Sequence, residues 1–328
     1  MKKILRVCRA LFVALIMLIL CGTVLPARVL PARLFALHAQ EVKQKSGIEL
    51  YPAALDITID AAKPEETASI FIINNNQEPI ELELNSIDFR QKDLSGIVQF
   101  LGVQSETYSY SLASYIQLPF TDIKLDPGEK KEVPIMIINR QDLSPGGHYA
   151  GIIVRQKPIK AQRKTVILPS VASLLFLRKT GGEQFNLSIR DVDWPKDIVQ
   201  FSYPGKLTLT FQNEGNVHLI PRGRIEIRDI FGRLISKGII NVSSVYVFPS
   251  SRRHIPIEIN KLRPSLPFSI NTVTIKGNDS LKKTNFLFQE SYVYINPVFV
   301  FTSLLSAILI IFLRRNSPRR FAVSSPKK

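Results

Sequence analysis

Two nine-residue stretches far apart in the chain align with each other without a gap. They are residues 127–135 (PGEKKEVPI) and residues 249–257 (PSSRRHIPI). Each begins with a proline in a polar turn, continues through a basic pair and ends in a Val/Ile-Pro-Ile segment typical of the start of a strand. One unit present twice in this form predicts two related domains, each built around its own copy.

Alternating apolar segments precede both copies. In the first half, residues 68–73 (ASIFII) and the strictly alternating residues 80–84 (IELEL) flank an Asn-rich turn. In the second half, residues 206–211 (KLTLTF) lead into the turn QNEGN at 212–216. Alternation indicates strands with one buried and one wet face, and no long 3.6-residue periodicity interrupts residues 48–288. The expected fold class is therefore all-β, with two tandem immunoglobulin-like β-sandwich domains and one C-terminal transmembrane α-helix.

The first repeat carries an elaborated loop, because its turn and its copy of the aligned stretch lie further apart than in the second repeat. The extra residues fall mostly between Phe89 and Pro119. This loop holds three candidate ligand-binding side chains, Tyr108, Tyr110 and Tyr115. Aromatic rings among serines suit contact with a sugar or a protein, since rings offer flat apolar faces and hydroxyls form hydrogen bonds. The alternative is that these tyrosines cover the edge of the core.

Both ends of the chain carry membrane signals. Residues 1–39 begin with basic residues and continue into an apolar run, which indicates a signal peptide or an uncleaved signal anchor. Residues 292–313 contain no charge and are long enough for one bilayer crossing, which needs about 20 residues. The expected anchor residues are Tyr292 at the outer interface, Asn296 and Pro297 at the helix start, and Arg314 and Arg315 on the cytoplasmic side.

The net charge of +16 is concentrated at these ends. Residues 1–40 and residues 291–328 each hold six basic residues and no acidic one, so the middle of the chain is close to neutral. Membrane topology explains this excess without nucleic-acid binding, for which no recognition motif is present. We therefore expect a cell-membrane protein with an extracellular or periplasmic ectodomain and a cytoplasmic C-terminus. The expected segments are 1–39 signal, 46–182 first sandwich, 183–289 second sandwich, 292–313 transmembrane helix and 314–328 basic tail.

Catalysis has no sequence support in this ectodomain, and the chain is not expected to be an enzyme. Nucleotide-binding, metalloprotease and serine-hydrolase motifs are absent between residues 41 and 290. Both cysteines, Cys8 and Cys21, lie in the N-terminal segment, and the four histidines are not spaced as a metal pair would require. No catalytic residue, cofactor or metal site is therefore predicted.

Two further features have a binding and a structural interpretation each, and a third has a structural one alone. The basic pairs 130–131 and 252–253 suit anionic wall polymers, or else they protect edge strands from aggregation. Trp194 is either a carbohydrate platform or part of a core. Residues 231–233 (FGR) indicate a hairpin turn.

The order of several motifs carries a resemblance to a known family. These motifs are GIELYPA (47–53), NNN (74–76), LDPGE (125–129), GGHYAGIIV (146–154) and a C-terminal helix with an arginine tail. In this order they resemble the bacterial WxL-interacting cell-surface proteins, over nearly the whole chain. The resemblance implies a first immunoglobulin-like domain that binds peptidoglycan, a second that contacts host or partner proteins, and a helix that anchors the molecule.

These observations favour a membrane-anchored, non-catalytic surface protein. Its expected partners are the cell wall (peptidoglycan), other surface proteins, or both, and the membrane through a single C-terminal pass. The alternative is a membrane-tethered, pilus-chaperone-like assembly factor for secreted subunits, which pairs with its client by strand addition. A third interpretation is a spacer that holds another component off the membrane.

Overall fold

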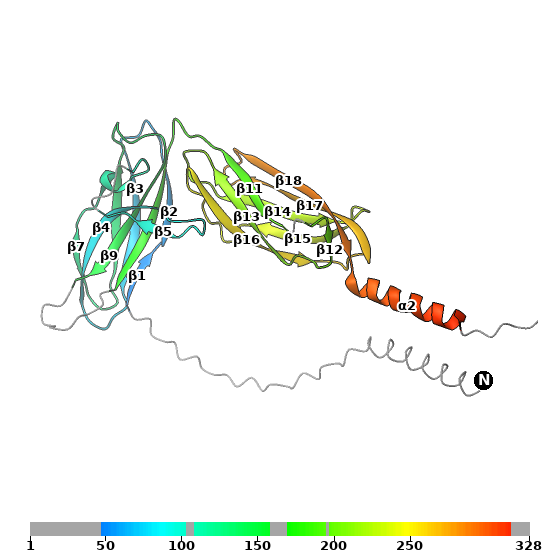
Figure 1. The fold of residues 1–328 in the computed structure, drawn as a ribbon. Helices are drawn as coiled ribbons and strands as arrows, with labels where there is room; N and C mark the ends of the chain where they lie inside the picture. Colours follow the sequence, from blue (N-terminus) through cyan, green and yellow to red (C-terminus); the bar gives the residue numbers. More distant parts are fainter. Residues whose placement is uncertain (1–46, 103–107, 158–168, 195–196, 316–328) are drawn as a thin grey trace, which may run out of the picture. The chain divides into compact units, whose positions relative to one another are not determined.

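The structure is a computed structural model that describes residues 47–102, 108–157, 169–194 and 197–315 (Figure 1). The expected signal segment at residues 1–39 and the end of the basic tail, residues 316–328, lie outside these ranges. The described chain is mostly β, in sandwich-like sheets that surround two separate apolar cores. The all-β expectation is thus confirmed.

The first sandwich consists of two sheets and one short 3₁₀ turn at Ala113–Tyr115. One sheet has the strand order β1-β3-β8-β6, and the other has the order β2-β10-β9-β4-β5, with β7 also paired to β4. Its strands are β1 (Ile48–Tyr51), β2 (Ala54–Ile59), β3 (Glu65–Asn74), β4 (Ile80–Gln91), β5 (Val98–Phe100), β6 (Ile116–Gln117), β7 (Asp122–Leu125), β8 (Lys130–Ile138), β9 (Gly146–Gln156) and β10 (Ser170–Lys179).

The second sandwich is one continuous eight-stranded path in the order β11-β13-β16-β15-β14-β17-β18-β12. Helix α2 (Pro297–Arg315) follows it. The strands are β11 (Leu187–Asp193), β12 (Val199–Gln200), β13 (Lys206–Asn213), β14 (Pro221–Arg228), β15 (Leu234–Ile240), β16 (Ser251–Lys261), β17 (Phe268–Asp279) and β18 (Asn285–Ile295).

The first two strands of each sandwich are paired in the same way. In the first, β1 pairs antiparallel with β3, and β2 then pairs parallel with β10. In the second, β11 pairs antiparallel with β13, and β12 then pairs parallel with β18. In each case the entering chain crosses from one layer to the other, which closes the edge of the sandwich.

The aligned stretches 127–135 and 249–257 occupy equivalent places in the two sandwiches. Val133 of β8 lies opposite Ile70 of β3, and its counterpart Ile255 of β16 lies opposite Leu209 of β13. All four side chains are buried. The repeat read from the sequence is therefore confirmed at the level of strand pairing, because both copies supply the same inward-facing position.

Helix α2 has a mean hydropathy of 2.2, and none of its residues is buried within the protein. By length and composition, it is the one helix in the described chain that is able to cross a bilayer. It begins later than expected, since β18 continues to Ile295. The expected boundaries at 289 and 292 therefore fall inside a strand, because β18 ends in uncharged residues that are indistinguishable by composition from the start of the helix.

Candidate binding site

Strand β16 has an edge that its neighbour leaves partly uncovered. On one side it pairs with β13 from Ser251 to Glu258. On the other side it pairs with β15 only from Ile259 to Lys261. The backbone of residues 252–258 therefore presents an edge to which no strand of the described chain is paired along its length.

The first sandwich covers the beginning of this edge with the hairpin between β4 and β5. The His254 backbone N–H donates to the Leu94 carbonyl at 2.8 Å, and the Gln91 side-chain amide donates to the Arg252 carbonyl at 2.5 Å. Backbone groups of alternate residues face the same side of a strand, so Pro256 presents its carbonyl in the same direction. Proline has no N–H, so this position offers an acceptor alone.

Beyond the hairpin tip, a groove of about 470 Å³ follows the uncovered edge. Its lining includes Ser95 from the first sandwich, residues 253–258 of β16, and Ile239, Val242 and Val245 on the opposite side. Ile239 and Val242 are 64% and 77% exposed. The groove therefore combines apolar side chains with backbone acceptors, which is the composition of an extended-peptide site.

Asn241 fixes the loop that forms the outer wall. Its side-chain amide donates to the carbonyls of Pro221 and Val245, and its Oδ1 accepts from the Val245 N–H. The backbone of Asn241 has φ 57°, a left-handed conformation that Asn tolerates better than most residues. The wall that carries Val242 is thus held by hydrogen bonds within the chain itself.

Arg253 lines the same groove with a half-buried guanidinium. Nη1 donates to the Tyr246 carbonyl at 2.7 Å, whereas Nε is buried and finds no acceptor among the described residues. Burial lowers the pKa of Arg253 from its usual value. A buried donor without a partner costs free energy, so the position of this guanidinium is maintained by the packing around it.

The hairpin tip fits closely against this arginine. A Cβ at Gly96 would lie only 2.2 Å from the Arg253 Cζ, and Gly96 has φ +79°. The left-handed turn therefore favours glycine, and a side chain here would also displace the guanidinium. The groove is thus built jointly by the two sandwiches.

An aromatic cluster joins the sandwiches behind the groove. Phe89, Tyr149 and Phe176 of the first sandwich are buried together with Phe248 of the second. Tyr149 and Phe248 have ring centroids 4.8 Å apart, and Phe176 stacks on Tyr246 at 4.3 Å. Aromatic pairs of this kind stabilise the folded protein by more than the burial of their apolar surface alone would.

A polar contact flanks the aromatic cluster. Asp56 lies 3.4 Å from the His218 Nε2 and accepts a hydrogen bond from the Tyr246 hydroxyl at 3.1 Å. Burial alone would raise the pKa of the Asp56 carboxyl, but the hydrogen bond and charge of His218, with the Tyr246 hydroxyl and the Arg178 charge, hold that pKa below its ordinary value of 3.8. Burial, followed by the charge of Asp56, raises the pKa of Tyr246 to about 12.

The three tyrosines predicted from the sequence do not form one site. Tyr108 and Tyr110 pack edge-to-face against each other, and both pack against the aromatic cluster. Tyr115 lies elsewhere, against the first core, with the Arg140 guanidinium 4.3 Å above its ring. The structure thus gives these rings packing partners, and ligand binding by them stays a prediction.

The anchor residues are placed in two different environments. The Asn296 side chain accepts from the Val298 N–H at 3.0 Å, and Pro297 is the first helical residue, as expected for a cap and first turn. Arg314 and Arg315 form the last turn. Tyr292, however, is a residue of β18, 3% exposed, whose ring packs on Trp194. The interfacial position expected for Tyr292 is therefore wrong.

The remaining sequence features have structural places. Trp194 is buried in the second core, as its structural interpretation had it. Residues 231–233 lie in the turn between β14 and β15. In the described residues, no group of three or more His, Cys, Asp or Glu side chains is arranged to hold a metal ion.

The groove and the joint between the sandwiches had no signal in the sequence. Both depend on which residues of the elaborated loop reach the second sandwich, and this is a tertiary property. The excess length of the first repeat located the responsible segment but not its contact.

Comparisons with known proteins found no matching family model and no match among curated proteins. Solved structures do align. A chain from a chaperone–tip adhesin complex of CFA/I fimbriae has a TM-score of 0.40 and 10% identity, with 75% of this chain and 99% of that chain covered. The class 5 fimbriae chaperone CfaA aligns with a TM-score of 0.39, 10% identity and coverage of 74% and 99%. The E. coli chaperone DraB aligns with a TM-score of 0.35, 14% identity and coverage of 75% and 97%. At these scores, nothing about the partner of this chain follows from them.

Proposed function

We propose that this chain is a membrane-tethered, non-catalytic assembly factor that holds an extended segment of a secreted or surface-exposed protein. In this proposal its two sandwiches are immunoglobulin-like domains, and α2 anchors them. The groove along β16 supports the proposal most directly. It pairs an uncovered strand edge with exposed apolar side chains, which is the composition needed for strand addition.

The chain already contains one instance of this kind of contact. The Leu94 carbonyl accepts from the His254 N–H, so a backbone carbonyl of the hairpin turn, from outside the second sandwich, is hydrogen-bonded to the β16 edge. A client segment would continue from that point along the groove. Its backbone N–H groups would meet carbonyls such as that of Pro256, which lines the groove.

Binding to the cell wall is the interpretation that the sequence favoured, and it stays a prediction. The tyrosines on which it relied are used for packing inside the chain. The groove, by contrast, has a size and lining suited to a peptide.

The proposal is tested by site-specific crosslinking of the full chain in the cells that produce it. A photo-crosslinking amino acid replaces Val242 in the groove, or Leu287 in β18 as a control of similar exposure outside it. We expect crosslinks from position 242 alone. Mass spectrometry should map them to one extended segment of one protein. Equal labelling from both positions would overturn the proposal.

The mapped segment is then made as a synthetic peptide and titrated onto the full-length protein. Ile239→Asp places a charge on the apolar wall and should weaken binding by about tenfold or more. Leu287→Asp should leave it unchanged. If both variants bind the peptide as the parent does, strand addition in this groove is excluded.

A further inference from the structure

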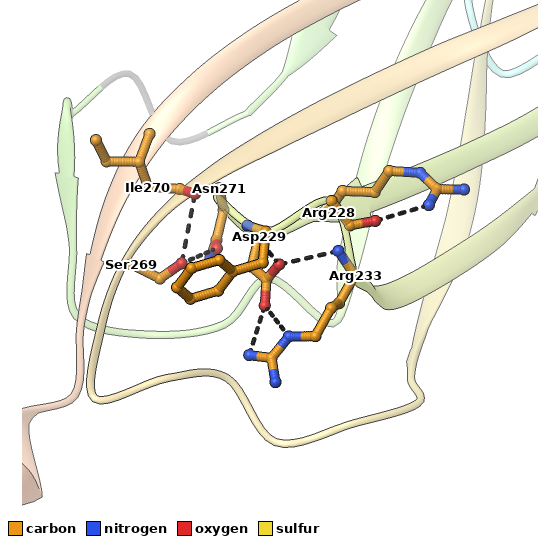
Figure 2. Close-up of polar contacts among 8 residues, drawn as sticks. Arg228, Asp229, Arg233, Ser269, Ile270 and Asn271 are labelled. Atoms are coloured by element: carbon orange, nitrogen blue, oxygen red, sulfur yellow. Dashed lines mark hydrogen bonds and ion pairs between the residues drawn. The ribbon is translucent and has the colours of Figure 1, made fainter.

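At one end of the second sandwich, the usual placement of polar and apolar side chains is reversed. Along the start of β17, Ser269 and Asn271 are buried, while Phe268 and Ile270 are exposed. Ser269 Oγ donates to Asn271 Oδ1 at 2.8 Å, so the inward polar groups satisfy each other (Figure 2). A strand of a soluble sandwich normally turns its apolar residues inward.

The adjacent turn between β14 and β15 shows the same reversal. The Asp229 side chain is almost fully buried and accepts from the N–H groups of Phe231 and Arg233 and from the Arg233 guanidinium (Figure 2). These bonds hold the turn so that Ile230 and Phe231 stand outside, 61% and 73% exposed. The acidic residue is inside and the apolar residues are in solvent.

Strand β12 repeats the pattern a third time. Gln200 is buried, while Ile198 and Phe201, which flank the two-residue strand, are 76% and 58% exposed. Elsewhere in the same sandwich the order is normal, as in β16, where Ile255, Ile257 and Ile259 are buried between exposed residues. The reversal is therefore local. We call the six exposed side chains Ile198, Phe201, Ile230, Phe231, Phe268 and Ile270 the apolar rim.

Strand pairing places the apolar rim where the chain leaves the sandwich for α2. Phe268 pairs with Ile295, the last residue of β18, and the Asn296 N–H donates to the Pro267 carbonyl at 2.8 Å. Gln200 pairs with Tyr294, and Arg228, which precedes the turn, pairs with Thr272. Pro297 then begins the apolar helix.

Exposed basic residues accompany the apolar rim, namely Arg228, Arg233, Lys261 and Arg263. Of these, Arg233 and Arg228 pair with the nearby Asp229 and Glu226, so Lys261 and Arg263 supply the remaining positive charge, with Asp197 exposed as well. Basic side chains beside exposed phenylalanines are the composition of surfaces that enter the headgroup layer of anionic membranes.

We infer that the apolar rim lies in the interfacial layer of the bilayer that α2 crosses, with lipid as its occupant. Chain continuity selects lipid, because Phe268 pairs with a residue only two positions before the helix and is held at the membrane surface when α2 is inserted. The rim phenylalanines then supply the interfacial aromatic contact that the sequence had assigned to the buried Tyr292. The inference rests on the anchoring part of the proposed function.

The test uses the full chain with Cys8→Ser and Cys21→Ser, reconstituted into vesicles of phosphatidylcholine and phosphatidylglycerol. Single cysteines carry an environment-sensitive fluorophore: Phe231→Cys in the apolar rim, Val242→Cys as a control of similar exposure, and Ile308→Cys inside α2. Val242 suits this control because its loop is bonded to Pro221, at the end of β14 opposite to Arg228. Nitroxide-labelled lipids serve as quenchers.

When the label at position 308 is quenched, we expect the label at position 231 to show blue-shifted emission. Its quenching should be several-fold stronger than that of the label at position 242. If 308 is quenched while 231 behaves like 242, the rim inference is wrong and the anchor stands. If 308 is not quenched, the anchoring proposal itself fails, and the rim inference fails with it.

Discussion

Asn213 makes in the second sandwich the hydrogen bonds that Asn74 makes in the first. Each side-chain amide donates to the carbonyl four residues later, and each Oδ1 accepts from the N–H two residues later. Each amide also reaches a carbonyl just before the repeated strand, Leu125 in one case and Val247 in the other. Both asparagines are fully buried.

Replacement of either asparagine should therefore destabilise its sandwich. Asn213→Ala leaves the Val217 and Val247 carbonyls and the Gly215 N–H without their partner, at a cost of about 1–3 kcal/mol. Chemical denaturation of the full chain in detergent measures the loss. Asn260→Ala, at an exposed position, is the control and should change stability by less than about 0.5 kcal/mol. Equal effects of the two changes would contradict this account.

Gly146 should tolerate no side chain, because it touches the second sandwich. Its φ is +120°, and a Cβ there would lie 2.9 Å from the Asn216 carbonyl oxygen. Gly146→Ala should cost about 1–3 kcal/mol from strain, with the clash in addition. Gly128→Ala is the matched control, since Gly128 has φ +75° but open space around its Cβ position. The unfolding temperature should fall further in the Gly146→Ala variant than in the Gly128→Ala variant.

Tyr108 and Tyr110 allow packing and ligand binding to be separated. Because their rings pack on the aromatic cluster, Tyr110→Ala should lower stability by about 0.5–1.5 kcal/mol. Co-sedimentation of the full chain with purified peptidoglycan is measured in parallel. Unchanged stability together with lost sedimentation would favour the wall-binding interpretation instead.

Acid should weaken the joint between the sandwiches through Asp56. Since its pKa in the folded protein lies below 3.8, the ionised carboxylate stabilises the fold above that pH, and this contribution is lost as the pH falls through the folded-state pKa. The side chain is 49% exposed, so the effect is modest, below about 1 kcal/mol. In a plot of unfolding temperature against pH, Asp56→Asn should make the decrease at low pH less steep. An unchanged decrease would show that other carboxylates control it.

The repeated strands were predictable because alternation and turn chemistry are local. The aligned stretches 127–135 and 249–257 identified equivalent strands, and Asn296 with Pro297 identified the start of the helix. Tyr292 was misplaced because an uncharged strand end followed by an apolar helix reads as one segment. The groove escaped prediction because Ser95 and Arg253 are brought together only by tertiary packing.

The shared groove has a consequence for the order of events during synthesis. The hairpin that carries Leu94 and Ser95 is made first, and the β16 edge that it meets is made much later. Domains generally fold as units, from the N-terminus, at about 5–20 residues per second of synthesis. The hairpin tip is therefore exposed to solvent until the second sandwich has folded against it. Under the proposed function, a half-made molecule has no complete groove, so binding of a client segment requires the finished chain.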